Sequence, residues 1–437
     1  MTAQVLSGRA RTIRRISVGL LVLSGIVNFM DRFALSVANP LIRQDLGLSI
    51  SSMGILLSAF LWAYALAQLP VGALVDRYGP RRLLAVGIVI WSLAQAAGGV
   101  VSNLGQFFAS RFMLGVGEAP QFTVGVRVVR DWFHFRERGL PTGIFLCSTA
   151  LGTAISAPVL TWLMLSFGWR AMFLIMGVAG VVLAMLWSAI YRNPADVGLP
   201  ASDHAYLQDG NTAADNHKVR FSEWRELFAL RNTWGMIAGY FGLLYLLWIY
   251  NAWLPSYFEI ERHMSIARTG IVSAFPFIFG VGGSVLGGWI PDRLVAMGIS
   301  PMNSRKFPFV LALATFAILT LVATQVENDA VSVAVLSIAS LFGFVANGSA
   351  WAMASVAAPH NRVASLASMQ NFGGYIGAAL APTITGFIVE EAGSFNPALF
   401  VGVTIGLASS LIYLVTVRDD ATERSLIKDE QPLGSLR

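Results

Sequence analysis

The chain has 437 residues, of which 55% are hydrophobic and only 12% are charged. A soluble domain usually carries about 25% charged residues, so this composition excludes an ordinary soluble fold and predicts that lipid is the main solvent. The net charge of +6 would suit a nucleic-acid partner in a soluble protein, but we expect no nucleic acid here, because the basic residues follow a membrane topology.

Apolar stretches of about 20 residues recur along the chain, and each is long enough to cross a bilayer core of about 30 Å. We expect helices, because a lone apolar segment must satisfy its own backbone hydrogen bonds. The sequence lacks the alternating short segments that are typical of a membrane barrel. The twelve expected transmembrane helices cover residues 16–38, 52–74, 82–102, 105–129, 139–165, 170–191, 233–257, 267–290, 306–324, 331–356, 363–388 and 396–417.

The Lys and Arg residues are distributed unevenly between the connections of these helices. With the N-terminus inside, cytoplasmic segments hold 24 of the 30 basic residues, and outer loops hold four. The positive-inside rule therefore predicts that both termini are cytoplasmic. The first apolar stretch is too long for the core of a cleavable signal sequence, so we expect it to remain as a transmembrane helix.

The longest connection, residues 192–232, is polar and separates six helices from six. It predicts a cytoplasmic linker between an N-terminal six-helix bundle (residues 1–191) and a C-terminal six-helix bundle with a cytoplasmic tail (residues 233–437). An internal repeat supports this division, because residues 72–77 and 288–293 both read Gly-x-x-x-Asp-Arg at the end of a predicted helix. Duplicated halves with a substrate site between them at the midplane are a transporter architecture.

Residues 72–82 read Gly-Ala-Leu-Val-Asp-Arg-Tyr-Gly-Pro-Arg-Arg. The segment resembles the loop 2–3 signature of the major facilitator superfamily; the alternative, a generic basic loop, is disfavoured by the repeat. In this signature, the glycine would allow close helix contact, and the aspartate could cap a neighbouring helix or pair with a basic residue. The resemblance implies an all-α membrane protein with two pseudo-symmetric six-helix bundles. The gating residues that it implies are Gly72, Asp76, Arg77, Asp292 and Arg293.

Four charged residues lie well inside predicted helices: Asp31 and Arg32 in helix 1, and Arg111 and Glu118 in helix 4. Each buried charge costs about 2.5–3.5 kcal/mol on insertion scales, so such groups are usually paired and functional. Arg111 and Glu118 are seven residues apart and therefore share one helix face. The alternative is a purely structural network of two ion pairs that locks helices together.

A further set combines polar and aromatic side chains. Asn28 lies on the same face of helix 1 as Arg32, and Tyr64 and Gln68 share a face of helix 2. Such groups would suit a hydroxylated, anionic ligand; the alternative is hydrogen bonding between helices or aromatic packing. The second half contributes similar groups on helices 10 and 11, at Asn347, Ser349, Trp351 and Asn371.

Nearly the whole chain resembles the anion:cation symporter family, in particular its bacterial sugar-acid proton symporters of the galactonate type. The resemblance is carried by residues 28–32, 58–70, 111–120, 132–133, 137–139, 168–170, 253–257 and 305–306. It implies that Arg32 binds the substrate carboxylate, that Asp31 and Glu118 carry protons, and that Arg111 tunes Glu118. The same resemblance implies a site lined by Tyr64, Ser349, Trp351 and Asn371.

Two positions depart from the galactonate-type pattern. Thr149 replaces a glutamine on helix 5, and Ala350 stands where a hydroxyl residue is expected. The site therefore offers fewer partners for sugar hydroxyls, which favours a less polar acid. We keep Thr149 among the expected binding residues, together with Asn28 and Gln68.

We expect proton-coupled secondary active import of a small organic anion, a sugar acid or related carboxylate, by alternating access. The alternatives are an organic-anion exchanger or facilitator, and an importer of an aromatic carboxylate. An embedded enzyme is disfavoured, because the five histidines form no ligand pair and no phosphate loop is present. We expect no cofactor, no metal and no catalytic residue. The predicted setting is the bacterial inner membrane, where a monomer would contact lipid, the anion and protons.

Overall fold

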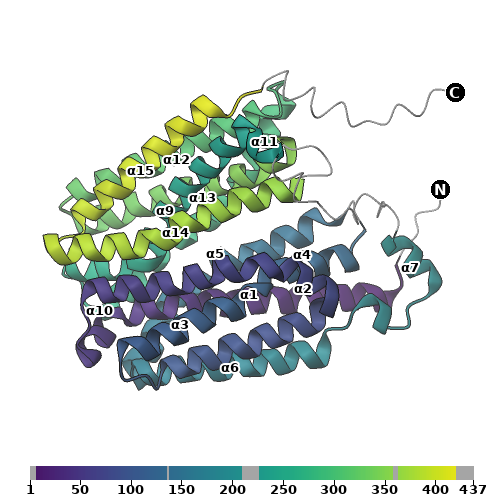
Figure 1. The fold of residues 1–437 in the computed structure, drawn as a ribbon, viewed down its shortest axis with the longest axis horizontal. Helices are drawn as coiled ribbons and strands as arrows, with labels where there is room; N and C mark the ends of the chain where they lie inside the picture. The colour runs from purple at the N-terminus through teal and green to yellow at the C-terminus, as the bar shows by residue number, and fades with distance from the viewer. Residues whose placement is uncertain (1–5, 135–136, 209–225, 358–362, 420–437) are drawn as a thin grey trace. The chain divides into compact units, whose positions relative to one another are not determined.

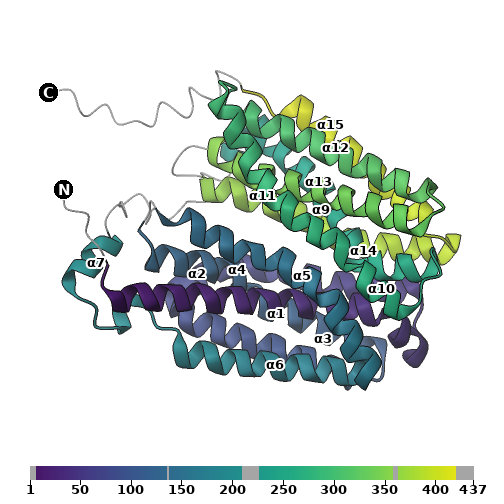
Figure 2. The same ribbon diagram turned by 180° about the vertical axis from the view of Figure 1, so that it is seen from behind.

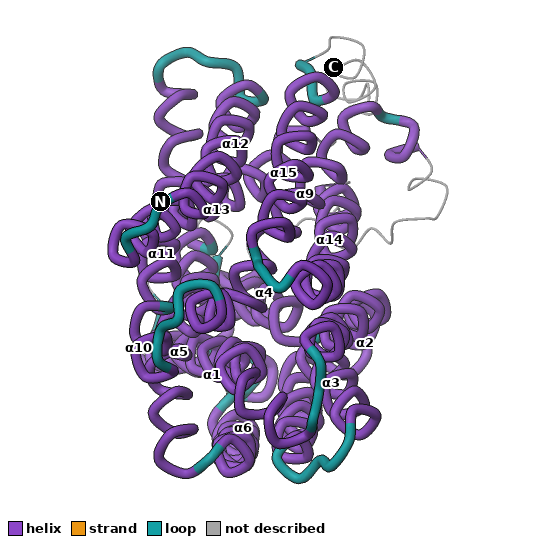
Figure 3. Tube along the Cα trace, turned by 90° about the vertical axis from the view of Figure 1, so that its left-hand side faces the viewer, coloured by secondary structure: helices purple, strands orange, loops and turns teal. Residues whose placement is uncertain are grey.

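The computed structural model describes residues 6–134, 137–208, 226–357 and 363–419, and nearly all of them are helical (Figures 1 and 3). No strand occurs within these ranges. Residues 209–225 of the expected linker and 420–437 of the expected tail lie outside the described residues. The helical fold predicted for the chain is therefore confirmed for the part that the structure describes.

In the first half of the chain, several helices begin at a side chain that accepts a backbone N–H, as Ser49 does before α2 and Asn103 does before α3. The helices of this half are α1 (Gly8–Leu46), α2 (Ile50–Gly98), α3 (Leu104–Glu118), α4 (Pro120–Trp132), α5 (Gly139–Phe167), α6 (Trp169–Ile190) and the short α7 (Ala201–Gln208). Those of the second half are α9 (Arg231–Ile260), α10 (Ile266–Val272), α11 (Ala274–Ala296), α12 (Asn303–Gln325), α13 (Asp329–Ala357), α14 (Val363–Ala392) and α15 (Asn396–Thr416).

The long helix α2 is a hairpin of two membrane crossings. A Cβ atom at Gly115 would collide with the backbone of Phe60, and one at Gly117 would collide with the backbone of Trp91. In a straight helix, Phe60 and Trp91 would lie about 46 Å apart, yet both contact the same turn of α3. The chain therefore reverses at Gly79, where φ is 75° and ψ is 161°. Glycine is needed at this point, because other residues rarely adopt a positive φ.

Ten helical stretches among the described residues are long and apolar enough to cross a membrane, with α10 and α11 counted together. The hairpin in α2 adds one crossing to this number. A further crossing is made by α3 and α4, which meet at Ala119 without leaving helical geometry (φ −53°, ψ −36°). Pro120 interrupts the hydrogen bonds there, because it has no N–H to donate. The described helices thus supply the twelve predicted crossings.

The described chain divides into two compact units. The first contains the described parts of Met1–Thr212, Trp248–Ile278 and Ala379–Ala398, and the second contains the described parts of Ala213–Leu247, Phe279–Ala378 and Leu399–Arg437. Helices α9, α11, α14 and α15 therefore each contribute one end to the first unit. The predicted domain boundaries at residues 191 and 233 stay a prediction.

The first unit consists of α1 to α7 and these helix ends, and α10 packs against α5 within it (Figures 1 and 2). The end of α14 lies directly on the beginning of α2. Thr383 donates through its hydroxyl to Ser58 at 2.7 Å, and a Cβ atom at Gly54 would collide with the carbonyl oxygen of Pro382. Glu390 then accepts from the backbone N–H of Ser51 at 2.7 Å. The second half of the sequence thus closes the end of the first unit at which α1 ends and α2 begins.

Candidate functional site

A buried ion pair joins α1 to α3 in the first unit. Arg32 donates through Nε to Oε2 of Glu118 at 2.6 Å, and the two side chains are only 4% and 0% exposed. Removing one partner of such a buried pair leaves an uncompensated charge, which typically costs about 3–5 kcal/mol. The structure therefore brings together a predicted carboxylate-binding residue and a predicted proton carrier.

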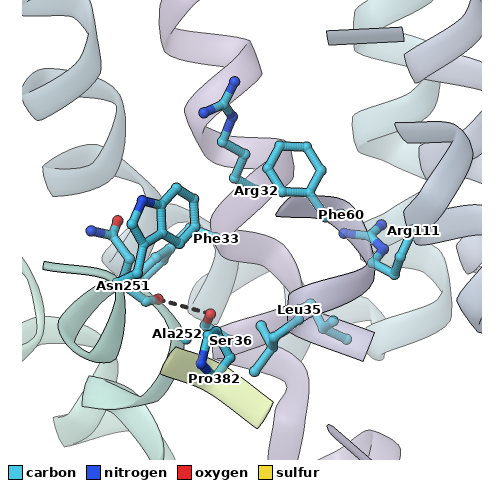
Figure 4. Close-up of a pocket in the computed structure, with 11 residues that line it drawn as sticks. Arg32, Phe33, Leu35, Ser36, Phe60, Arg111, Asn251, Ala252 and Pro382 are labelled. Atoms are coloured by element: carbon cyan, nitrogen blue, oxygen red, sulfur yellow. Dashed lines mark hydrogen bonds between the residues drawn. The ribbon is translucent and has the colours of Figure 1, made fainter. Parts of the chain in front are cut away.

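Aromatic rings surround the guanidinium group of Arg32. Its Cζ atom lies 4.7 Å from the ring centre of Phe29, 5.0 Å from that of Phe60 and 4.7 Å from that of Tyr64. The electron-rich faces of these rings attract a cation, so they hold the group in place without neutralising it. Figure 4 shows the ring of Phe60 beside Arg32. Tyr64 was predicted as a site residue; Phe29 and Phe60 were not singled out, although both lie in the recognised segments.

Arg111 shares a helix face with Glu118 but makes its hydrogen bonds to other residues. Its Nη2 donates to Oε1 of Gln95 at 2.6 Å, and its Nη1 donates to the backbone oxygen of Asp31 at 3.4 Å. Among the described residues, Arg111 therefore makes no hydrogen bond with Glu118, but it acts on Glu118 electrostatically, and its expected role of tuning Glu118 stays a prediction. Sharing a helix face brings two side chains near each other, but the partner is decided by the neighbouring helices, which supply Arg32 and Gln95.

Asp31 is completely buried beside this pair. Neither of its carboxylate oxygens has a hydrogen-bond partner among the described residues. Glu118 and Arg111 are the charged groups that act on it electrostatically. Burial of a charge without hydrogen bonds is costly. Asp31 is therefore suited to bind a proton or to accept a hydrogen bond from a group that enters the site.

A small cavity adjoins the ion pair, with room for a single water molecule at about 20 Å³ (Figure 4). Helix α9 contributes Trp248 and Asn251 to its wall, and neither is among the predicted site residues. Ser36 donates to the backbone oxygen of Asn251 at 2.9 Å. The sequence contains a signal for Asn251, which is Pro255. Proline has no N–H, so the backbone carbonyl of Asn251, four residues earlier, cannot accept the usual helical hydrogen bond and is available to Ser36.

The predicted site residues of the second unit form a cluster of their own. Tyr240 donates to Oδ1 of Asn347 at 2.9 Å, and its ring meets Trp351 edge-on with centres 6.4 Å apart. Ser349 is buried and donates at 3.5 Å to the carbonyl oxygen of Gly287. Asn371 is half-buried. A role for these residues in binding the same ligand as Arg32 stays a prediction.

Three further predicted site residues lie in the first unit. Asn28 is completely buried in α1, on the helix that carries Arg32. Gln68 is half-buried in α2. Thr149 donates its hydroxyl to the carbonyl oxygen of Leu146 at 2.9 Å within α5, so this hydroxyl serves its own helix in the structure.

The predicted gating loop is held by an arginine that the motif does not contain. Arg127 donates to Asp76 at 2.7 Å and to Asp131 at 2.9 Å, so it links α2 to α4. Asp76 therefore pairs with a basic residue, as one of its expected roles required. The close helix contact expected at Gly72 is not seen, because no neighbouring atom lies within 4 Å of a Cβ placed there. Arg77 lies over the ring of Tyr78.

The repeated segment in the second unit makes a similar but looser contact. Asp292 lies 3.9 Å from Nη2 of Arg305, and Arg293 is exposed. In each half, the aspartate of the repeat thus faces an arginine from a later part of the same half.

The sequence matches the Major Facilitator Superfamily over residues 21–382. The chain belongs to this superfamily. It is 41% identical over 412 residues to the probable L-galactonate transporter of Escherichia coli strain K12, and the match covers 94% of this chain and 91% of that protein. It is 33% identical over 427 residues to the probable galactarate/D-glucarate transporter GudP of Bacillus subtilis strain 168, with 94% and 93% covered.

A solved structure has the same fold. The bacterial homologue of the human lysosomal transporter Spinster, in an inward-facing and occupied conformation, aligns with a TM-score of 0.76 at 15% identity over 94% of this chain and 98% of that one. The predicted fold class is therefore confirmed. The protein is a multi-pass membrane transporter of this superfamily and not an enzyme, because its family and its relatives are transporters.

Proposed function

We propose that this transporter imports a sugar acid or a related carboxylate together with protons, by alternating access across the bacterial inner membrane. The observation that carries the proposal is the buried ion pair between Arg32 and Glu118 at 2.6 Å. The names of the relatives, which are transporters of galactonate and of galactarate or glucarate, support a sugar acid as the substrate class.

The ion pair supplies a physical basis for coupling. A substrate carboxylate that binds the guanidinium of Arg32 through Nε would displace the carboxylate of Glu118, because both compete for that donor. Once displaced, Glu118 would be a buried charge without its partner, and binding a proton removes that cost. Proton binding and anion binding therefore favour each other through one arginine.

Asp31 is the second proposed proton carrier. Its carboxylate is buried without a hydrogen-bond partner among the described residues, so no donor stabilises its ionised form. A monovalent acid that moves with two protons would carry net positive charge inward. The membrane potential favours such a movement by about 2.3 kcal/mol per 100 mV for each charge.

The proposed orientation places both termini in the cytoplasm, because 24 of the 30 basic residues then lie on that side. The second candidate substrate is an aromatic carboxylate. It is favoured by the rings around Arg32 and by Thr149 and Ala350, which leave fewer partners for sugar hydroxyls. Exchange without protons is the alternative mode of transport.

The test uses purified protein in proteoliposomes with galactonate as the probe. We expect uptake that rises when the outside is made acidic and the inside electrically negative, and that collapses with a protonophore. Counterflow without either gradient measures exchange in the same vesicles. Equal accumulation with and without imposed gradients would contradict proton coupling, and uptake of an aromatic acid in preference to galactonate would select the second substrate class.

A further inference from the structure

Gln95 is a buried polar residue that lies outside the segments that carry the family resemblance. It lies in the second crossing of α2, is completely buried, and accepts at 2.6 Å from Nη2 of Arg111 through its Oε1. A hydrogen bond from a guanidinium to an amide oxygen is charge-assisted, and it is stronger in a water-excluded interior than in water. The amide therefore fixes the direction in which Arg111 points.

Two other contacts restrict the same guanidinium. Its Nη1 reaches the backbone oxygen of Asp31 at 3.4 Å. Its Cζ lies 5.8 Å from the ring centre of Phe107 and 5.2 Å from that of Phe173. Arg111 is thus held among α1, α2, α3 and α6, with only 1% of its surface exposed. It cannot follow a ligand without breaking several buried contacts.

The held arginine lies beside an acid that it does not neutralise. The carboxylate oxygens of Asp31 have no hydrogen-bond partner among the described residues, although Arg111 contacts the backbone of the same residue. The charged side chains that act on Asp31 are Arg111 and Glu118 on α3, and its chain neighbour Arg32 is occupied by Glu118. Without its amide partner, Nη2 of Arg111 would lose this hydrogen bond, and the carboxylates that attract Arg111 are those of Asp31 and Glu118.

We propose that Gln95 is a positioning residue, which holds Arg111 as a fixed cation near Asp31 and prevents the two from forming a direct ion pair. Asp31 can then exchange a proton during each transport cycle, while Arg111 limits how tightly that proton is held. The inference rests on the proposed proton coupling and assigns the control of one coupling site to a residue outside that site.

The test compares two substitutions with opposite expected effects. In Gln95→Glu, the new carboxylate pairs with Arg111 and cancels its field, so Asp31 holds its proton to higher pH. In Gln95→Met, the released arginine turns to Asp31 and stabilises its charged form. The measurement is galactonate counterflow in proteoliposomes with equal pH on both sides. We expect the alkaline midpoint to rise by roughly one pH unit in Gln95→Glu and to fall by a similar amount in Gln95→Met.

A matched control is Ser92→Ala, one turn earlier in α2, because the buried Ser92 hydroxyl donates only to the carbonyl oxygen of Ile88 in its own helix. Its midpoint should stay at the wild-type value. In an Asp31→Asn background, Gln95→Glu should no longer move the pH dependence of galactonate binding, measured by thermal shift. A shift that persists there would overturn the assignment to Asp31.

Midpoints that move in the same direction, or that stay fixed while the protein remains folded, would show that Gln95 has only a packing role. If Gln95→Met does not fold, the nearly isosteric Gln95→Glu decides alone, and an unchanged midpoint overturns the proposal. A wild-type protein whose transport is independent of pH would instead contradict the proposed function, which keeps the two failures distinguishable.

Discussion

Arg32 forms its buried ion pair with Glu118 of another helix, and not with Asp31, its neighbour in the chain. Consecutive helical residues point about 100° apart, so Asp31 and Arg32 face different surroundings. Within α1, Arg32 therefore pairs with a carboxylate of α3, and the preceding residue, Asp31, buries a carboxylate without a hydrogen-bond partner among the described residues.

Arg32→Ala should weaken galactonate binding by at least about 100-fold, which corresponds to about 2.7 kcal/mol. Arg32→Lys should also be badly impaired, because an ammonium does not reproduce the planar fork that matches a carboxylate. Binding to purified protein, measured by calorimetry, checks both. Arg170→Ala is the control, since Arg170 pairs at 3.0 Å with Asp45 in an exposed contact. Wild-type affinity in Arg32→Ala would refute the assignment.

Glu118→Gln should lose proton-driven accumulation and keep substrate counterflow. The amide is a fixed neutral mimic of the protonated acid, so it competes with substrate for Arg32 less strongly than a carboxylate does and no longer carries a proton. Uptake into proteoliposomes with an imposed pH gradient and potential is compared with counterflow without either. Glu137→Gln, which removes an exposed partner of Arg14 at 2.7 Å, should behave as wild type. If Glu118→Gln still accumulates substrate when protons are the only driving ion, Glu118 is not the coupling site and its ion pair with Arg32 is structural.

Galactonate should be transported at least tenfold better than galactarate. The charged side chains well inside the described helices are Asp31, Arg32, Arg111 and Glu118, whereas those of α9 to α15 lie near helix ends. With Arg111 held by Gln95, a second carboxylate would meet no cation of its own and would be costly to occlude. The two ligands share one carbon skeleton, so competition for labelled galactonate isolates the extra charge. Equal inhibition by galactonate and galactarate would show that other groups of the protein bind the second carboxylate.

Asp76→Asn should slow transport several-fold and leave substrate affinity within a few-fold of wild type. Asp76 pairs with the partly exposed Arg127, which also pairs with Asp131, and an exposed pair contributes little to stability, about 0–1 kcal/mol. The measurement is the turnover number beside the dissociation constant. Arg127→Gln should slow transport similarly, and the double variant should be no slower than either single one. Normal turnover in both single variants would show that this loop has no role in gating.

Cysteines at Ser58 and Thr383 should form a disulfide in a Cys147→Ser background. The two hydroxyl oxygens lie 2.7 Å apart, so small side-chain adjustments bring two sulfur atoms within bonding distance. Cross-linking should stop transport, and a reductant should restore it, because the bond joins α2 to α14. A pair at Ser58 and Ser394 is the negative control. Failure to cross-link under mild oxidation would contradict this contact.

The sequence alone determined the membrane class, the twelve crossings and the identity of the interior charges. These follow from one-dimensional physics: an apolar stretch must be long enough to cross the bilayer, and a charge in an apolar run is costly enough to stand out. The loop signature at residues 72–82 and the segments around Asp31 and Glu118 then indicated the superfamily to which the chain belongs.

Only the tertiary structure decided which charges meet. Helical spacing placed Arg111 and Glu118 on one face, but Gln95 and Arg32 became their partners, because α1 and α2 present these groups at hydrogen-bonding distance. The tertiary structure likewise decided that Arg127 pairs with Asp76 at the predicted gating loop and that Asn251 lines the same cavity as Arg32. Partner choice depends on contacts between residues far apart in the chain, and periodicity along a single helix contains no information about them.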